Sequence, residues 1–193
     1  MRRQQQAFTL TELIIAIAIA AVVLMLAVPS FLDYMRVQRL KSINAQLVTD
    51  LMLARSEAVT RGTISRVNFG QNTDLTCYTL YVNRVGASSG VRCDCTLGAG
   101  AACGSSSSEL RTVQVLRSTG VAVQVPSGDT ALGFSHVTGA LVGIPTDQGV
   151  IAVDSFVVET SLDSTRLLRD TLGKTGRVTV CGVGRNLGAE TCP

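Results

Sequence analysis

The sequence predicts an α+β protein: one long N-terminal helix, transmembrane in its first half, packed on an antiparallel, β-sandwich-like domain of about seven strands. Residues 13–28 form an uncharged apolar run, and a single segment can cross a bilayer only as a helix. Apolar residues then recur every three or four positions as far as Ala58. Beyond Gly62, short segments rich in valine and threonine are typical of strands.

The start of the chain has the features of a processed membrane segment. Arg2 and Arg3 precede Phe8, and one carboxylate, Glu12, stands at the mouth of the apolar run. A buried carboxylate needs a partner or a proton, so the presence of Glu12 at the start of the apolar run needs an explanation. An ordinary signal peptide would have a cleavage site after a shorter apolar core. Here the expected cut lies before the run, between Ala7 and Phe8, so the run would stay in the mature chain.

This stretch resembles the prepilin leader of type IV pilins and type II secretion pseudopilins. The resemblance implies that a prepilin peptidase cuts between Ala7 and Phe8 and methylates the new amino terminus of Phe8. In that family the fifth mature residue is a glutamate and a proline stands at mature position 22, which correspond to Glu12 and Pro29. The residue before the cut is usually glycine, so Ala7 implies slower processing.

The chemistry of Glu12 agrees with this resemblance. Cleavage would create an amino group at Phe8, and the Glu12 of a neighbouring subunit could neutralise it in an apolar filament core. An ion pair is far stronger there than in water. Subunits that packed with the wrong axial stagger would leave Glu12 unpaired, which is unfavourable. We therefore expect this residue to set the register of assembly.

One helix is predicted over residues 9–61. Pro29 removes a backbone hydrogen bond and is expected to kink or loosen it, and Gly62 is expected to end it. The second half carries an apolar stripe that needs a partner surface. The stripe comprises Leu40, Ile43, Leu47, Leu51, Ala54 and Ala58, with Arg39, Lys41, Asp50 and Glu57 off it.

Residues 54–58 read Ala-Arg-Ser-Glu-Ala and are followed by the basic Arg61. This pattern resembles the helix end of the GspH/FimT branch of minor pilins and pseudopilins. Arg55 and Glu57 are too close in sequence to face each other, so a solvated helix end and a specific contact both stay open. The resemblance implies four regions: a leader peptide at 1–7, a transmembrane and filament-core helix at 8–30, its amphipathic continuation at 31–62, and a disulfide-stapled periplasmic β domain at 63–193.

Seven segments beyond the helix have strand patterns. Val121, Val123 and Val125 alternate with a period of two, as do Val178 and Val180, so these two strands should each bury one face. Residues 98–108, rich in glycine, alanine and serine, are predicted to form a flexible loop. The predicted strands cover residues 64–69, 75–82, 112–116, 121–125, 132–134, 150–158 and 177–180.

The six cysteines all follow the apolar run, and an even number in an exported segment indicates disulfides. The basic Arg2 and Arg3 would stay in the cytoplasm, which places the domain in the periplasm. Cys181 and Cys192 are expected to pair with each other.

The other four cysteines leave two pairings open. Strain disfavours a Cys93–Cys95 bond, so these two are expected to pair with Cys77 and Cys103 in either order. A metal cluster of Cys93, Cys95 and Cys103 is less favoured, because no histidine is near and the compartment is oxidising.

Composition and motifs argue against an enzyme. The net charge is +3, and without Arg2 and Arg3 the chain has 15 basic against 14 acidic side chains, so bulk charge does not predict a nucleic-acid partner. His136, the one histidine, lies beside no nucleophile or base, and we interpret it as structural. No phosphate loop or dinucleotide fingerprint is present, and we expect no cofactor and no metal.

The C-terminal stretch Gly176-Arg177-Val178-Thr179 bears on an alternative function. Some members of the FimT branch take part in DNA uptake and carry a Gly-Arg-x-Arg motif that contacts DNA. Here Thr179 stands in place of the second arginine, and Lys174 and Arg185 are the nearby cations. A final strand with solvated charges is the preferred interpretation.

The sequence therefore predicts a minor pilin or pseudopilin in a type IV pilus or a type II secretion pseudopilus. It would be a single-pass inner-membrane precursor whose partners are other pilin subunits and the prepilin peptidase. The alternative is a DNA-binding minor pilin for natural transformation that uses Lys174, Arg177 and Arg185. A periplasmic metal-binding or redox domain is a third possibility, and it would retain free thiols.

Overall fold

The structure, a computed structural model, describes residues 10–88, 90–144, 149–184 and 187–192. The chain divides into two compact units, residues 1–36 and residues 37–193. One helix, α1 (Leu10–Arg61), begins in the first unit and ends in the second, and its bounds agree with the predicted 9–61. The two units are described separately below.

Helix α1 ends at Gly62, as the sequence predicted. Gly62 has a φ of 61°, in the left-handed region. Its N–H donates to the carbonyl of Val59 at 3.4 Å, and the N–H of Thr63 donates to the carbonyl of Ala58 at 3.3 Å. These two hydrogen bonds form a Schellman motif, which satisfies two carbonyls that a helix end leaves without partners. The motif favours glycine at the left-handed position, here Gly62.

No single helix in the described part of the chain is long and apolar enough to cross a membrane by itself. Residues 10–25 and 30–61 of α1 satisfy the criterion of length and composition only when they are taken together.

Ten strands in the described residues form two antiparallel sheets, so the predicted α+β class is confirmed. The six-stranded sheet has the order β3-β2-β1-β5-β6-β7, and the four-stranded sheet has the order β10-β9-β8-β4. Their bounds are β1 (Ser65–Gln71), β2 (Leu75–Asn83), β3 (Ser107–Leu116), β4 (Ala122–Gln124), β5 (Ala131–Phe134), β6 (Leu141–Gly143), β7 (Ile151–Ala152), β8 (Ser155–Asp163), β9 (Arg166–Gly173) and β10 (Val178–Val183). Two short 3₁₀ turns, η1 (Cys95–Leu97) and η2 (Arg117–Thr119), complete the elements.

The structure has more strands than the predicted seven or so, for two reasons. Strands β6 and β7 contain three and two residues, too few to show an alternating pattern. Strand β9 was missed because Asp170 occupies one of its inward-facing positions between Leu168 and Leu172, and a charged residue there breaks the apolar alternation. The predicted strand 150–158 divides between two sheets, since β7 pairs with β6 and β8 pairs with β9.

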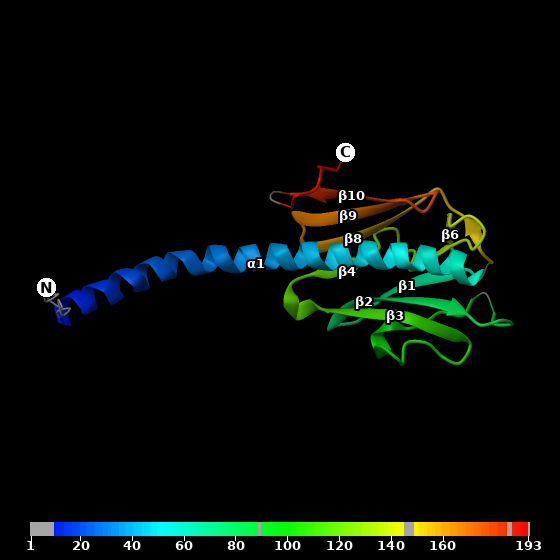
Figure 1. Ribbon diagram of the computed structural model, residues 1–193, viewed down its shortest axis with the longest axis horizontal. Coiled ribbons are helices and arrows are strands. Elements are labelled where there is room, and N and C mark those ends of the chain that lie inside the picture. The colour runs from blue at the N-terminus through cyan, green and yellow to red at the C-terminus, as the bar shows by residue number, and fades with distance from the viewer. Residues whose placement is uncertain (1–9, 89, 145–148, 185–186, 193) are drawn as a thin grey trace, which may run out of the picture. The chain divides into compact units, whose positions relative to one another are not determined.

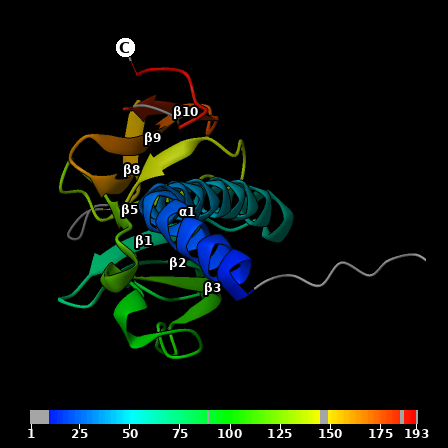
Figure 2. The same ribbon diagram turned by 90° about the vertical axis from the view of Figure 1, so that its left-hand side faces the viewer.

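The core of the second unit lies where the C-terminal half of α1 passes between the two sheets. Figure 1 shows this part of the helix with β8–β10 on one side and β1–β3 on the other, and Figure 2 shows the same order down the helix. Leu40, Leu47 and Leu51 are completely or almost completely buried, and each such side chain contributes about 1.5–3 kcal/mol of hydrophobic stabilisation. The helix contacts a single apolar cluster that includes Tyr78 from one sheet and Leu172 from the other.

A buried acidic residue connects α1 to the six-stranded sheet. The Tyr78 hydroxyl donates to Asp50 Oδ2 at 2.7 Å, and Arg111 Nη1 lies 3.0 Å from Asp50 Oδ1. Burial and the hydrogen bond to Asp50 both raise the pKa of Tyr78. The interpretation of Asp50 as lying off the apolar stripe is wrong: it comes three residues after Leu47 and four before Ala54, on the same helix face, and is fully buried.

A second polar pair connects α1 to the four-stranded sheet. Asn44 Nδ2 donates to Asp170 Oδ1 at 3.1 Å, and both side chains are buried. Asn44 and Asp50 therefore bind the same helix to opposite sheets.

All three disulfides lie in the second unit. The Cys181–Cys192 bond is the pair expected from the sequence. It holds the end of the described chain against β10, where Gly182 pairs with Thr191. The order that the sequence left open is Cys77–Cys95 and Cys93–Cys103.

Candidate functional site

The described residues of the first unit present an apolar surface on every side of α1. Between Leu10 and Leu32, Glu12 is the one charged residue, and it lies in the first turn of the helix. Exposed apolar surface on this scale marks a protein–protein or membrane contact. The large side chains that are half or more exposed are Leu10, Leu13, Ile14, Ile15, Ile17, Ile19, Val22, Val23, Leu24, Met25, Val28, Phe31, Leu32, Tyr34 and Met35.

Several predicted site residues are outside the described part of the structure. Ala7 and Phe8 precede it, Arg185 falls in a gap, and the side chain of Pro29 is not described although its backbone lies within α1. Cleavage, methylation and the roles of Pro29 and Arg185 therefore stay predictions.

The structure places Lys174 and Arg177 in one exposed turn, between β9 and β10. The turn is closed by the N–H of Gly176, which donates to the carbonyl of Gly173 at 2.8 Å, and by the N–H of Gly173, which donates to the carbonyl of Arg177 at 2.9 Å. Lys174 Nζ lies 3.5 Å from Asp154 Oδ1, and both side chains are largely exposed.

Thr179, which stands where the DNA-contacting motif has an arginine, follows on β10. Its hydroxyl donates to the carbonyl of Thr171 at 3.2 Å on the neighbouring strand. The sequence between Gly176 and Thr179 thus supplies one exposed cation, Arg177, and a second side chain that bonds within the sheet.

Arg55 connects the end of α1 to this turn, a contact that the sequence left undecided. Arg55 Nε donates to the carbonyl of Gly139 at 3.0 Å. Gly176 lies against the same carbonyl of Gly139. Its φ is 75°, and a Cβ atom on residue 176 would clash with the Gly139 carbonyl oxygen. No side chain larger than that of glycine fits without displacing backbone, so the Gly176–Arg177 turn is positioned by Arg55 and Gly139 together.

The rest of the Ala54–Ala58 pattern also has a structural reason. Ala54 and Ala58 are completely buried and belong to the apolar core cluster. Glu57 pairs with Arg61, four residues later, on the helix surface.

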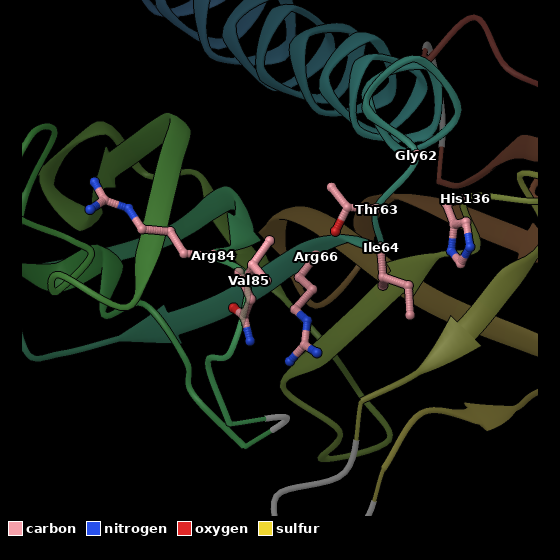
Figure 3. A pocket seen from close by; sticks show the side chains of 8 residues that line it. Gly62, Thr63, Ile64, Arg66, Arg84, Val85 and His136 are labelled. Carbon is pink, nitrogen blue, oxygen red and sulfur yellow. The ribbon is translucent and has the colours of Figure 1, made fainter.

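A pocket of about 240 Å³ lies beside the end of α1. It is lined by residues that follow the helix, by Arg66 on β1, by the end of β2 with Arg84 after it, and by His136 beyond the end of β5. Figure 3 shows Arg84 and His136 pointing to opposite sides, with Arg66 between them. These three side chains therefore do not converge on one point.

The cysteines that a metal-binding or redox domain would need as free thiols are all in disulfides. Cys93, Cys95 and Cys103, the thiols that a metal cluster would need, are each bonded, and the structure contains no free cysteine. Among the described residues, no group of three or more histidine, cysteine, aspartate or glutamate side chains is placed to hold a metal ion.

Two family patterns match the chain, one after the other. Residues 2–28 match the prokaryotic N-terminal methylation motif, and residues 44–189 match the type II transport protein GspH. The second match covers most of the chain and includes both sheets.

Comparison with individual proteins adds two structural likenesses. Two crystal structures of the type IV minor pilin FimU from Pseudomonas aeruginosa (strain PAO1) resemble the chain. The first, in space group P21, is 16% identical with a TM-score of 0.49, over 78% of this chain and 91% of FimU. The second, in space group P65, is 13% identical with a TM-score of 0.45, over 76% and 90%. No curated protein is significantly similar in sequence.

The family assignment rests on the sequence matches, which together run from the basic leader to the C-terminal disulfide segment. The chain belongs to the GspH family of type II transport proteins, the minor pilins and pseudopilins, and begins with a prokaryotic N-terminal methylation motif.

Proposed function

We propose that this chain is a minor pilin or pseudopilin that assembles into a type IV pilus or a type II secretion pseudopilus. Assembly would use the part of α1 that lies in the first unit. One observation carries the proposal: the described residues of that unit expose apolar side chains all round the helix, with Glu12 as the one charge in the run. A helix of this kind is stable only in lipid or among other helices. The second unit buries its own core and needs no such cover.

The same proposal accounts for both ends of the chain. The precursor would be a single-pass inner-membrane protein with Arg2 and Arg3 in the cytoplasm and the second unit in the periplasm. Three disulfides suit that compartment, because they persist in oxidising surroundings. A prepilin peptidase would then cut between Ala7 and Phe8, and other pilin subunits would cover the exposed helix.

Mass spectrometry of isolated filaments tests the proposal. The full chain is expressed with the other subunits of its filament, and the filaments are sheared off and purified. The expected product is a chain that begins at Phe8 and carries one methyl group on its amino terminus. A chain that keeps residues 1–7 and is found only in the membrane fraction would contradict the proposal.

DNA contact is the less supported function, although one observation favours it. Lys174 and Arg177 lie in the same exposed turn, and such cations contribute the salt-dependent part of DNA affinity. Two observations oppose it: the acidic Asp154 lies 3.5 Å from Lys174, and the Thr179 hydroxyl is bonded within the sheet.

A salt series separates these interpretations. If the turn binds DNA, the oxidised full chain in detergent should bind duplex DNA with an affinity that falls steeply as salt rises, and Arg177→Ala should weaken binding several-fold. Arg166→Ala, at the other end of β9, is the matched control and should leave the affinity unchanged. Absence of binding at low salt would remove this function.

A further inference from the structure

Asn44 and Asp170 form a buried pair in which two oxygen atoms have no partner. Asn44 Nδ2 donates to Asp170 Oδ1 at 3.1 Å, which uses one atom of each side chain. The remaining atoms, Asn44 Oδ1 and Asp170 Oδ2, are both buried and have no hydrogen-bond donor in the described protein. Both are acceptors when Asp170 is ionised, so neither can satisfy the other. Unsatisfied buried oxygens are costly, and two in one pair require an explanation.

The surroundings of Asp170 supply no charge to balance an ionised carboxylate. Its register partners on β8 and β10 are Val158 and Val180. In the described part of the chain no basic side chain forms an ion pair with it. The charged residues on the elements that pack against it are Arg39, Lys41, Asp50, Arg55, Glu57 and Arg61 on the second-unit part of α1, Glu159 and Asp163 on β8, and Arg166 and Arg169 on β9, with none on β10.

Arg39 is exposed, Arg55 donates to the carbonyl of Gly139, Glu57 pairs with Arg61, and Arg166 pairs with Asp163. The remaining charges are also engaged or directed elsewhere. Asp50 is bound by the six-stranded sheet. Glu159 and Arg169 pair at 2.8 Å, and because Arg169 precedes Asp170 on the strand, their pair lies on the opposite face of the sheet. Lys41 Nζ lies beside Gly188.

We propose that Asn44 and Asp170 are a proton-operated clamp between α1 and the four-stranded sheet, closed when Asp170 is protonated and opened when it ionises. One proton on Oδ2 converts that oxygen into a donor, and its natural acceptor is Asn44 Oδ1. The two side chains then form a ring of two hydrogen bonds, acid to amide and amide to acid, and both unpartnered oxygens are satisfied by a single proton. The clamp is independent of the proposed function, since it lies wholly within the second unit.

The direction of the pH dependence follows from the burial of the group. Burial raises the pKa of Asp170 from its usual 3.8 to about 7, and the hydrogen bond from Asn44 opposes this only in part. The folded chain therefore holds a proton that the unfolded chain releases between about pH 4 and pH 7. The free energy of unfolding is highest below about pH 4, falls as the pH rises to about 7, and is constant above that pH. The unfolding equilibrium constant rises up to about tenfold per pH unit in that window.

Hydrogen exchange at β9 tests the clamp in the full chain in detergent micelles, between pH 5 and pH 8, after correction for intrinsic exchange rates. The wild type should lose protection as pH rises. Asp170→Asn should show constant protection, higher than that of the wild type at pH 8, because an amide makes both hydrogen bonds without a proton. Asp154→Asn removes an exposed carboxylate as the matched control, and it should show the wild-type loss.

Two further measurements can overturn the proposal. The ¹³C signal of the Asp170 carboxyl in the wild type should titrate near pH 7, and a midpoint near 4 would show that no proton is held there. Asn44→Leu keeps Asp170 buried but removes its partner, so it should lose protection of β9 at pH 5. If Asn44→Leu is as protected as the wild type at pH 5, the ring does not hold the helix and the proposal fails.

Discussion

Replacing Glu12 with alanine is expected to abolish incorporation of the chain into filaments while residues 37–193 stay folded. Glu12 is the one charged residue in the apolar run, so in an assembled core it would be the natural partner for the amino terminus that the proposed cleavage would create at Phe8. Breaking a buried ion pair by removing one partner costs about 3–5 kcal/mol, because here it would leave a buried amine without a counter-charge. The ratio of chain in sheared filaments to chain in membranes measures the effect.

The folded unit provides the first control for this experiment. Residues 37–193 contain the whole hydrophobic core and all three disulfides, so hydrogen exchange of the strands should be unchanged in Glu12→Ala. Asp33→Ala removes the other acidic residue of the first unit, outside the apolar run, and should incorporate normally. Glu12→Gln retains the size of the side chain without its charge and should fail as Glu12→Ala does. Normal incorporation of Glu12→Ala would show that assembly does not need this carboxylate.

Replacing Asp50 with alanine should destabilise the second unit by about 1.5–3 kcal/mol, the usual contribution of a hydrogen bond to a charged group, because the carboxylate and the Tyr78 hydroxyl are buried while Arg111 is half exposed. The Asp50 carboxylate accepts from Tyr78 at 2.7 Å and lies 3.0 Å from Arg111, so its removal leaves a buried hydroxyl and a guanidinium without their partner. For a unit of this size, that corresponds to a fall in melting temperature of roughly 5–10 °C. Thermal unfolding of the full chain in detergent, followed by near-ultraviolet circular dichroism of tyrosine, measures it.

Glu57→Ala is the matched control, because it removes an acidic residue from the same helix. Glu57 pairs with Arg61 at the surface, where such a pair is worth about 0.3–0.5 kcal/mol. Its melting temperature should fall by about 1 °C. Equal effects for Asp50→Ala and Glu57→Ala would mean that the buried contact contributes no more than a surface pair does.

The bounds of α1 and the family could be predicted because both depend on residues close together in the chain. The apolar run, the three-and-four spacing of the stripe and the Gly62 stop act over one or two helix turns, and they place the helix end correctly. The leader and the Ala54–Ala58 pattern are likewise contiguous, and the family they indicated matches residues 2–28 and 44–189.

The polar contacts of α1 could not be predicted, because each joins residues far apart in the sequence. Asn44 meets Asp170 across 126 residues, and Arg55 meets Gly139 across 84. Local patterns identify Asp50 and Asp170 as charged and therefore favour solvent for both. Only the packing of the helix between the two sheets buries them. Once buried, each carboxylate must have a hydrogen-bonding or charged partner, or take up a proton.

The sequence by itself thus determined the helix, the class of fold and the family, since local periodicity and contiguous motifs carry that information. The tertiary structure alone decided the sheet order, the position of β9, the order of Cys77–Cys95 and Cys93–Cys103, and the seating of Gly176 against Gly139. The physical reason is that strand pairing and cross-linking depend on which distant segments meet. That is set by the core as a whole and by no single stretch of residues.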